Sequence, residues 1–286
     1  MLHRWNSVVE NINLAIGKLK QLTKRVVPQI KGRGRKPKHD LSRYILLLVL
    51  KEFDKKTLRG AEVRLSELIC TERVDHSVIS YWENKRGMEQ VVRQIITLAG
   101  ALLQRVLLSL FSFVDATKFT SWKIQEVEVT LCNRIAQGTV YPVGISFQRE
   151  KVALPVEESV PDGEGLLYAD AGYDVNDAIG VLFKKGYIPI VCPSKNRWKG
   201  YWRKKSRKLY RMPEHRLGYR QRGRGESVFA SLTNGYGDRF TAVNNQAMKT
   251  RIASRVLCYQ LRLLLRVESS CLRLIVRHAL KTINFK

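Results

Sequence analysis

The order of apolar segments between residues 111 and 194 restricts the fold of this 286-residue chain more than any other feature. Three alternating apolar segments follow one another with short turns between them, and a fourth and a fifth are separated by a helical pattern at residues 175–186. The segments are FSFVDATKF (111–119), EVEVTLCNR (126–134), TVYPVGISFQRE (139–150), LLYADAGYD (166–174) and YIPIVCPS (187–194). Short turns join antiparallel strands, whereas a crossover helix joins parallel ones. We therefore predict an α/β fold with a mixed sheet flanked by helices, in which residues 154–165 are a linker between the third and fourth strands.

The charge balance predicts a polyanionic partner. The chain has 51 Lys and Arg residues against 25 Asp and Glu residues, which gives a formal net charge of +26. A basic surface of this size favours nucleic acid as the partner, and an anionic membrane surface is the weaker alternative.

The most apolar window, Ile95–Val114, is not predicted to span a membrane. Gln104 and Arg105 stand at its middle, and a charge at membrane depth is costly. The window instead fits the end of a long buried helix over residues 88–110 that runs into a strand. The five cysteines have no metal-ligand spacing and the N-terminus has no secretion signal. We expect a reduced, cytoplasmic and nucleoid-associated protein with no membrane partner.

Residues 1–40 are predicted to form an N-terminal helix followed by a basic linker. The linker KGRGRKPKHD (31–40) combines two glycines and a proline with five cations. Arg33, Arg35 and Lys36 are its candidate DNA contacts, because short Arg–Gly–Arg arms can lie in the minor groove. The alternative is a solvated tether that touches phosphates without selectivity.

Three further helices favour an all-α, helix-turn-helix-like DNA-binding region at residues 41–110. Leu41–Phe53 is strongly apolar, and Thr57 is a good N-cap for a second helix over residues 58–69. A helical bundle with another role is the alternative.

The third of these helices, in SVISYWENK (77–85), is the candidate recognition helix, and Asp75 or Ser77 is expected to cap it. Its candidate DNA contacts are Tyr81, Asn84 and Lys85, and its expected buried edge is Val78, Ile79 and Trp82.

Residues 195–212 form a basic insertion with interleaved aromatic residues. The part KNRWKGYWRKKSRKLYR (195–211) has nine cations. Cations with aromatic rings suit a groove that tracks a nucleic-acid backbone and stacks bases. Its candidate DNA contacts are Trp198, Trp202, Lys204 and Lys205. The alternative is an exposed basic loop whose rings pack on the sheet.

Acidic residues at strand ends are the candidates for catalysis. The chain has no P-loop and no G-x-S-x-G turn, which argues against an ATP motor and a serine nucleophile. Asp115 and Asp170 each end a buried strand, where open α/β sheets place their sites. Divalent Mg²⁺ would relieve both their burial and their mutual repulsion. Glu226, beside several arginines, is placed to supply a third carboxylate from a helix. A turn cap at Asp170 and an ion pair between Arg222 and Glu226 are the alternatives.

Three segments resemble the catalytic blocks of the DDE transposases of bacterial and archaeal insertion sequences. They are FVDATKF (113–119), LLYADAGYD (166–174) and YRQRGRGESVF (219–229). Tyr219, Arg222 and Glu226 follow the Tyr–x2–Arg–x3–Glu–x6–Lys signature of one group of these enzymes, and Thr233 stands at the position of its lysine. The DNA-binding region is similar as well, so that the resemblance extends over about residues 31–266.

The resemblance implies an RNase H-like catalytic domain over residues 111–266, followed by a helical tail at 267–286. Asp115, Asp170 and Glu226 would be its catalytic residues and the ligands of a two-metal Mg²⁺ site, with Mn²⁺ as a substitute. The implied reaction is cleavage of double-stranded DNA at terminal inverted repeats and strand transfer into target DNA, by a homodimer in a synaptic complex. The resemblance also implies that Tyr219 and Arg222 grip the DNA backbone, and Arg224 is a further candidate contact.

Two other functions fit the same residues. An impaired or domesticated transposase would bind DNA as a repressor, and Thr233 and the short segment between the third and fourth strands favour this reading. An RNase H-like nuclease would cleave DNA without a preference for inverted repeats.

Overall fold

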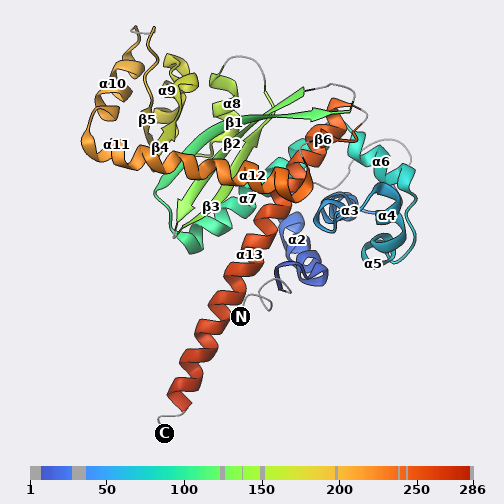
Figure 1. Ribbon diagram of the computed structural model, residues 1–286. Helices are drawn as coiled ribbons and strands as arrows, with labels where there is room; N and C mark the ends of the chain where they lie inside the picture. The colour runs from blue at the N-terminus through green and yellow to red at the C-terminus, as the bar shows by residue number, and fades with distance from the viewer. Residues whose placement is uncertain are drawn as a thin grey trace.

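The computed structural model describes residues 8–27, 37–122, 126–136, 138–148, 152–196, 199–237, 239–242 and 244–283. The centre of the molecule is a mixed sheet with the strand order β3-β2-β1-β4-β5 (Figure 1). Its strands are β1 (Phe111–Ser121), β2 (Glu126–Ala136), β3 (Thr139–Ser146), β4 (Gly165–Ala169) and β5 (Tyr187–Val191). A short strand, β6 (Arg239–Phe240), pairs with the end of β1. β1 pairs antiparallel with β2, and β4 pairs parallel with β5, as the predicted connections require. β1 also pairs parallel with β4.

The helices between β3 and α12 cover the sheet and correct one prediction. They are α8 (Ala153–Ser159), α9 (Asn176–Lys184), α10 (Tyr201–Tyr210) and α11 (Pro213–Tyr219). Residues 154–165 were predicted to be a linker, but α8 lies there and packs on β3. Gly144 permits this close approach, because a Cβ atom at that position would lie 2.0 Å from the Ser159 carbonyl oxygen.

A continuous helical rod crosses one face of the sheet (Figure 1). It consists of α11, the 3₁₀ turns η2 (Arg220–Gly225) and α12 (Glu226–Tyr236). The last helix, α13 (Asn245–Ile283), packs against the helical region before the sheet, and its C-terminal part projects away from the body (Figure 1). α13 runs without a break across residue 266, where the predicted catalytic domain ends and the predicted tail begins.

The part before the sheet is helical, as predicted. Its helices are α2 (Ile12–Val26), α3 (Leu41–Phe53), α4 (Leu58–Arg64), α5 (Ser66–Cys70), α6 (His76–Asn84) and α7 (Met88–Leu107). Thr57 caps α4 by accepting the Gly60 N–H at 3.1 Å, and Asp75 caps α6 by accepting the Ser77 N–H at 2.7 Å.

Two details of this helical region differ from the predictions. The single helix expected over residues 58–69 is divided at Leu65 into α4 and α5. The Ser66 hydroxyl donates back to the Glu62 carbonyl oxygen at this break, and such bonds compete with the helical ladder. Ile79 and Trp82 are buried in α6 as expected, whereas Val78 is 37% exposed. No helix in the part of the chain that the structure describes is long and apolar enough to cross a membrane.

Candidate active site

Parallel pairing of β1 and β4 brings two of the predicted acids together. Val114 on β1 is in register with Ala169 on β4, so the next residues, Asp115 and Asp170, lie side by side where β4 ends. Both line a cavity of about 230 Å³. Asp170 also caps the 3₁₀ turn η1 (Ala171–Tyr173) by accepting the Gly172 N–H at 2.9 Å. Asp170 therefore caps a turn and also lies at the candidate site, so its two expected roles do not exclude each other.

The ionised form of Asp115 is disfavoured. Burial raises the pKa of the Asp115 carboxyl above its usual range, and the nearby charges of Asp170 and Glu226 raise it further. The Ala116 N–H, which donates to Asp115 Oδ1 at 3.0 Å, and the Arg222 guanidinium lower this pKa but do not reverse its direction. A carboxylate in this situation is stabilised by a bound cation.

Glu226 is the first residue of α12 and is exposed. The preceding residue, Gly225, is buried, and a Cβ atom there would lie 3.8 Å from Phe113 Cβ. This contact lays the start of α12 on the strand that carries Asp115, which explains why the Glu226 charge acts on the Asp115 carboxyl.

The three carboxylates are close enough to interact but do not converge. Among the described residues, the only group of three His, Cys, Asp or Glu side chains with ligand atoms within 4.8 Å of one another is Glu62, Asp75 and His76, outside the sheet. Glu62 in that group is already bonded by Arg73 at 2.7 Å and by His76 Nδ1 at 2.9 Å. These bonds hold the start of α6 in place. Because they occupy the carboxylate oxygens of Glu62, this group does not offer them to a metal ion.

Arg222 pairs with Asp115 instead of Glu226. Its Nη1 atom lies 3.6 Å from Asp115 Oδ2, and its guanidinium lies 5.9 Å from the centre of the Tyr219 ring. Tyr219 is half-buried and meets the rings of Tyr168 and Tyr210 edge to face. Burial raises the pKa of the Tyr219 phenol, so that the hydroxyl stays neutral and able to donate a hydrogen bond.

A further acid, Glu128 on β2, lies at the same cavity. Glu128 is half-buried and lines the cavity with Asp115, Asp170 and Tyr173. Burial raises the pKa of the Tyr173 phenol, and the charges of all three acids contribute to this shift. Alternation along the second strand was the available signal: Glu128 and Thr130 share a face, and Thr130 also lines the cavity.

The basic insertion is anchored by a buried acid. Asp174, which is 1% exposed, accepts from Arg203 Nε at 2.9 Å and from Arg207 Nη2 at 3.1 Å. The Ser194 N–H donates to the same carboxylate at 2.8 Å. Two cations of the basic insertion, neither of them among its candidate DNA contacts, therefore hold α10 against the end of η1.

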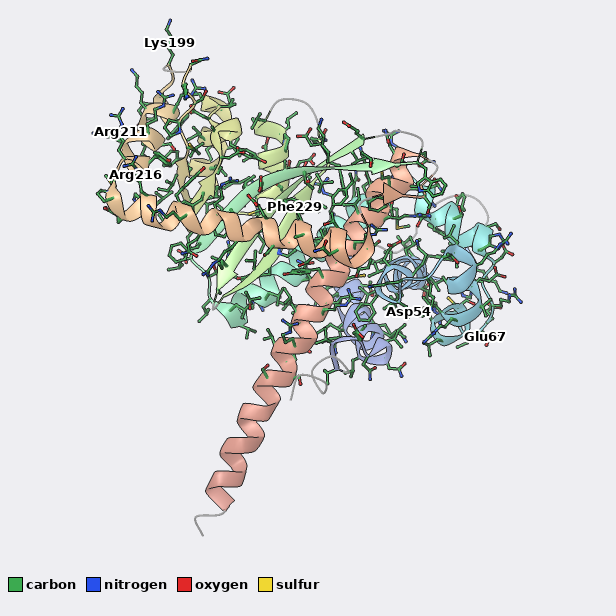
Figure 2. All side chains as sticks on the ribbon, in the orientation of Figure 1. Asp54, Glu67, Lys199, Arg211, Arg216 and Phe229 are labelled. Carbon is green, nitrogen blue, oxygen red and sulfur yellow. The ribbon has the colours of Figure 1, made fainter. Side chains whose placement is uncertain are left out.

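Other side chains of the insertion are distributed between packing and solvent. Trp202 packs on α9, with its ring centre 5.1 Å from that of Phe183. Lys204 and Lys205 are exposed, and Lys205 Nζ lies 4.4 Å from the centre of the Phe183 ring. Trp198 lies outside the described residues. Exposed Lys199, Arg211 and Arg216 project from this end of the molecule (Figure 2).

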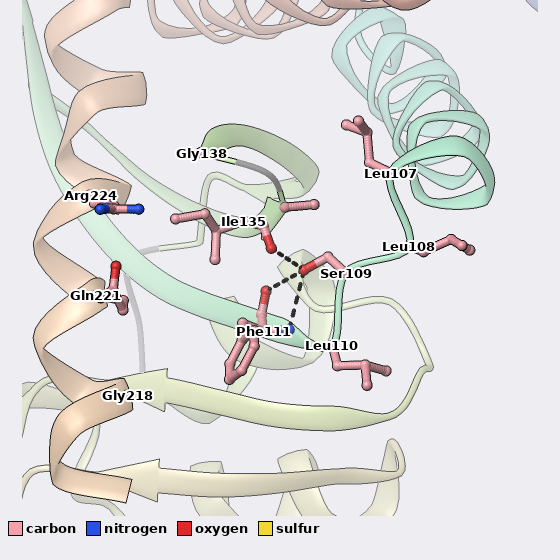
Figure 3. Close-up of a pocket in the computed structure, with 11 residues that line it drawn as sticks. Leu107, Leu108, Ser109, Leu110, Phe111, Ile135, Gly138, Gly218, Gln221 and Arg224 are labelled. Atoms are coloured by element: carbon pink, nitrogen blue, oxygen red, sulfur yellow. Dashed lines mark hydrogen bonds between the residues drawn. The ribbon is translucent and has the colours of Figure 1, made fainter. Parts of the chain in front are cut away.

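Arg224 is exposed on a different side of η2 from the carboxylates. With Gln221 it borders a cavity of about 710 Å³ at the start of β1, which includes Phe111 (Figure 3). In this cavity the Ser109 hydroxyl donates to the Ile135 carbonyl oxygen and joins the ends of β1 and β2 (Figure 3).

The residues predicted to contact DNA in the helical region have different surroundings. Tyr81 is 60% exposed, and Lys85 Nζ lies 4.1 Å from a ring centre of Trp82. Asn84 is half-buried and accepts from the Asn244 amide at 2.6 Å, at the start of α13. Arg33, Arg35 and Lys36 lie outside the described residues.

Comparison with known families gave one match. Residues 148–261 match the family model of the transposase DDE domain. The DDE domain match covers less than half of the chain and includes Asp170 and Glu226, while Asp115 on β1 precedes it. Comparisons with curated proteins and with solved structures gave no match. This segment is therefore similar to the DDE domain of transposases.

Proposed function

We propose that this protein is a DDE transposase that cleaves double-stranded DNA at the terminal inverted repeats of its element and transfers the strand into target DNA. One observation carries the proposal. Asp115 and Asp170 follow paired residues of adjacent parallel strands, and the charges of Asp170 and Glu226 both act on Asp115. A first-strand acid, an acid after the fourth strand and an acid on a later helix are the arrangement expected of an RNase H-like catalytic domain.

The donor set of this site suits Mg²⁺, with Mn²⁺ as a substitute. All its ligands would be carboxylate oxygens, which hard divalent cations prefer, and the raised pKa of Asp115 reports a charge that a cation would stabilise. Asp115, Asp170 and Glu226 would hold the metal. Bound divalent ions supply positive charge to the attacking and leaving oxygens of an in-line displacement at phosphorus.

Arg222 and Tyr219 are suited to hold the DNA backbone beside these acids. The Arg222 guanidinium is near Asp115, at a separation of 3.6 Å that is longer than a strong charge-assisted hydrogen bond. It is available to a phosphate that binds against the carboxylates. The neutral Tyr219 hydroxyl can donate to the same phosphate group. A water would attack the phosphorus at the element end and displace the 3′-oxygen of the element strand. The 3′-hydroxyl so released would attack a phosphodiester of target DNA and displace the 3′-oxygen of the cut target strand. We infer a homodimer that pairs two element ends.

Metal removal tests this function directly. A duplex that carries the inverted repeat found in the DNA flanking the gene is incubated with the protein. We expect a nick at the repeat end with Mg²⁺ or Mn²⁺, because the carboxylates need a cation, and no nick with EDTA. Denaturing gels of end-labelled strands measure the product. Cleavage of branched DNA without preference for the repeat would instead indicate an RNase H-like nuclease.

A DNA-binding repressor is the second candidate, and the environment of Thr233 favours it. Its hydroxyl donates to the carbonyl oxygens of Phe229 and Ala230, both at 3.1 Å, and so is directed to its own helix. A lysine in the signature would offer a charge to phosphate at this position. Lys249 on α13 is a half-buried cation that could replace it. Repeat binding without cleavage in either metal would support the repressor.

Glu128→Gln is expected to weaken the binding of the metal without abolishing cleavage. Glu128 lines the cavity of Asp115 and Asp170, and groups next to metal ligands commonly change affinity by roughly 10–100-fold. The concentration of Mg²⁺ that gives half-maximal nicking should therefore rise by about tenfold. The control is Glu126→Gln, because Glu126 is an exposed acid at the start of the same strand. Equal Mg²⁺ dependence in both variants would remove Glu128 from the site.

A further inference from the structure

A basic cleft lies between the helical region and the end of the helix that begins with Glu226. Its volume is about 700 Å³. The turn between α3 and α4 forms one wall, α6 forms another, and Gly235 and Tyr236 at the end of α12 form a third. Six cationic and two acidic side chains line it.

The two acids of the cleft are fully engaged by cations at its base. Glu83 is 2% exposed and pairs with Lys51 at 3.0 Å and with Arg251 at 2.8 Å. Glu52 pairs with Lys51 at 2.7 Å and with Arg255 at 2.9 Å. Burial raises the pKa of Glu52, but Lys51 and Arg255 together bring it below its usual range. Three cations thus share two carboxylates, and this base keeps a net positive charge.

The remaining cations stand on the wall without acidic partners. Lys55, Lys56 and Arg59 line the cleft, and the described part of the chain offers them no carboxylate within ion-pair distance. Lys55 and Arg59 are exposed, and Lys56 is half-buried. Uncompensated cations that line one cleft attract an anion. The cleft also contains hydrogen-bonding groups of Ser80 and His76 on α6.

We propose that the basic cleft binds backbone phosphates of the same DNA duplex that enters the carboxylate site. The proposal rests on the proposed function, since it needs DNA at Glu226. It adds a contact that lies between the candidate recognition helix and the DDE domain. The chemistry recognised is the phosphodiester backbone, so binding here does not depend on base sequence.

The length of α12 is short enough for one DNA duplex to reach both the carboxylate site and the basic cleft. Glu226 starts the helix and Tyr236 ends it, and ten residues at about 1.5 Å each span roughly 15 Å. At 3.4 Å per base pair, this length corresponds to roughly four base pairs. A DNA phosphate bound in the cleft would therefore fix the distance along the duplex between the base pairs that α6 contacts and the phosphodiester that lies at the carboxylates.

The salt dependence of DNA binding tests the cleft. We compare the wild-type chain with the Lys56→Ala, Arg59→Ala double variant on a 30-base-pair duplex of mixed sequence. Each lost phosphate contact changes the slope of log affinity against log salt by about 0.9. We expect the double variant to bind about 10–100-fold more weakly at 0.1 M salt, with a slope less steep by about two.

A matched control separates the cleft from the overall charge. The Lys20→Ala, Lys24→Ala double variant removes two exposed cations from α2 and should keep the wild-type slope. Equal losses in the two double variants would overturn the proposal, and so would an unchanged slope at the cleft. Amine acylation of the wild-type chain gives an independent measurement that requires no folded variant: DNA should protect Lys55 and Lys56 but not Lys20 and Lys24. Failure of the wild-type chain to bind any duplex would instead refute the proposed function.

Discussion

Asp115→Asn is expected to abolish metal-dependent cleavage and at the same time to make the protein more stable. The carboxylate is a proposed metal ligand, and loss of a group that stabilises charge in the reaction costs at least about 10²–10³-fold in rate. Asp170→Asn and Glu226→Gln should have the same effect on cleavage. All three variants should still bind the repeat, because none removes a cation. Gel-shift and nicking assays with the same duplex measure both properties.

The stability gain of Asp115→Asn should depend on pH. The folded-state pKa of Asp115 is raised, so the folded protein binds the proton more tightly than the unfolded chain. The stability that this proton contributes is present below the unfolded pKa and is lost as pH rises through the folded pKa. An asparagine does not ionise, so the variant should melt above the wild-type protein at neutral pH, and the difference should vanish in acid.

Thermal unfolding without metal at several pH values measures this difference. The control is Glu157→Gln, which removes an exposed carboxylate from α8 and should change neither cleavage nor the melting temperature. A variant that melts below the wild-type protein at neutral pH would show that the Asp115 charge is well compensated. Cleavage retained by the Asn variant would exclude Asp115 from catalysis.

The apolar strands that carry Asp115 and Asp170 could be predicted from the sequence, but their pairing could not. The strand–helix–strand connection joins β4 to β5, and the parallel pairing of β1 with β4 depends on long-range contacts that this pattern does not specify. Asp170 follows the end of β4 as predicted, whereas β1 continues beyond Asp115 to Ser121, because its second half pairs with β2 and β6. The position of Glu128 required the register of β1 on β2, which alternation does not specify on its own.

The partner of Arg222 was not predictable from its spacing. In an α-helix, Arg222 and Glu226 would be neighbours on one face, as the i, i+4 spacing implies. Residues 220–225 are instead 3₁₀ turns, with three residues per turn, and α12 begins only at Glu226. The change of pitch takes the Arg222 side chain off the row of Glu226, and the guanidinium meets Asp115 on the sheet.

The composition of the basic insertion did not predict which of its cations pair with a buried acid, for a related reason. The cations at residues 203 and 207 resemble the other cations of the segment in sequence, but their partner Asp174 is about thirty residues away in the chain. Burial of that carboxylate requires nearby positive charge. The same pair of arginines that suggests nucleic acid in the sequence is therefore part of the folded core.

Asp174→Ala is expected to destabilise the fold by about 3–5 kcal/mol, because removing one partner leaves the buried guanidinium groups without compensation. Arg203 and Arg207 side chains are each 11% exposed, so water cannot replace the carboxylate without movement of α10. Urea unfolding measures the loss, and faster tryptic cleavage within α10 should accompany it.

Two further variants separate the buried network from a general effect of charge. Asp177→Ala removes an exposed acid from the first turn of α9 and should leave both measurements unchanged. Adding Arg207→Leu to Asp174→Ala should recover part of the stability, since one unpaired charge is then absent. Full additivity of the two changes would mean that the 3.1 Å contact between Arg207 and Asp174 does not hold α10 in place. The cleavage rate of the Asp174→Ala variant is informative as well: Asp174 ends the turn that Asp170 begins, so release of α10 should lower the rate even where the protein remains folded.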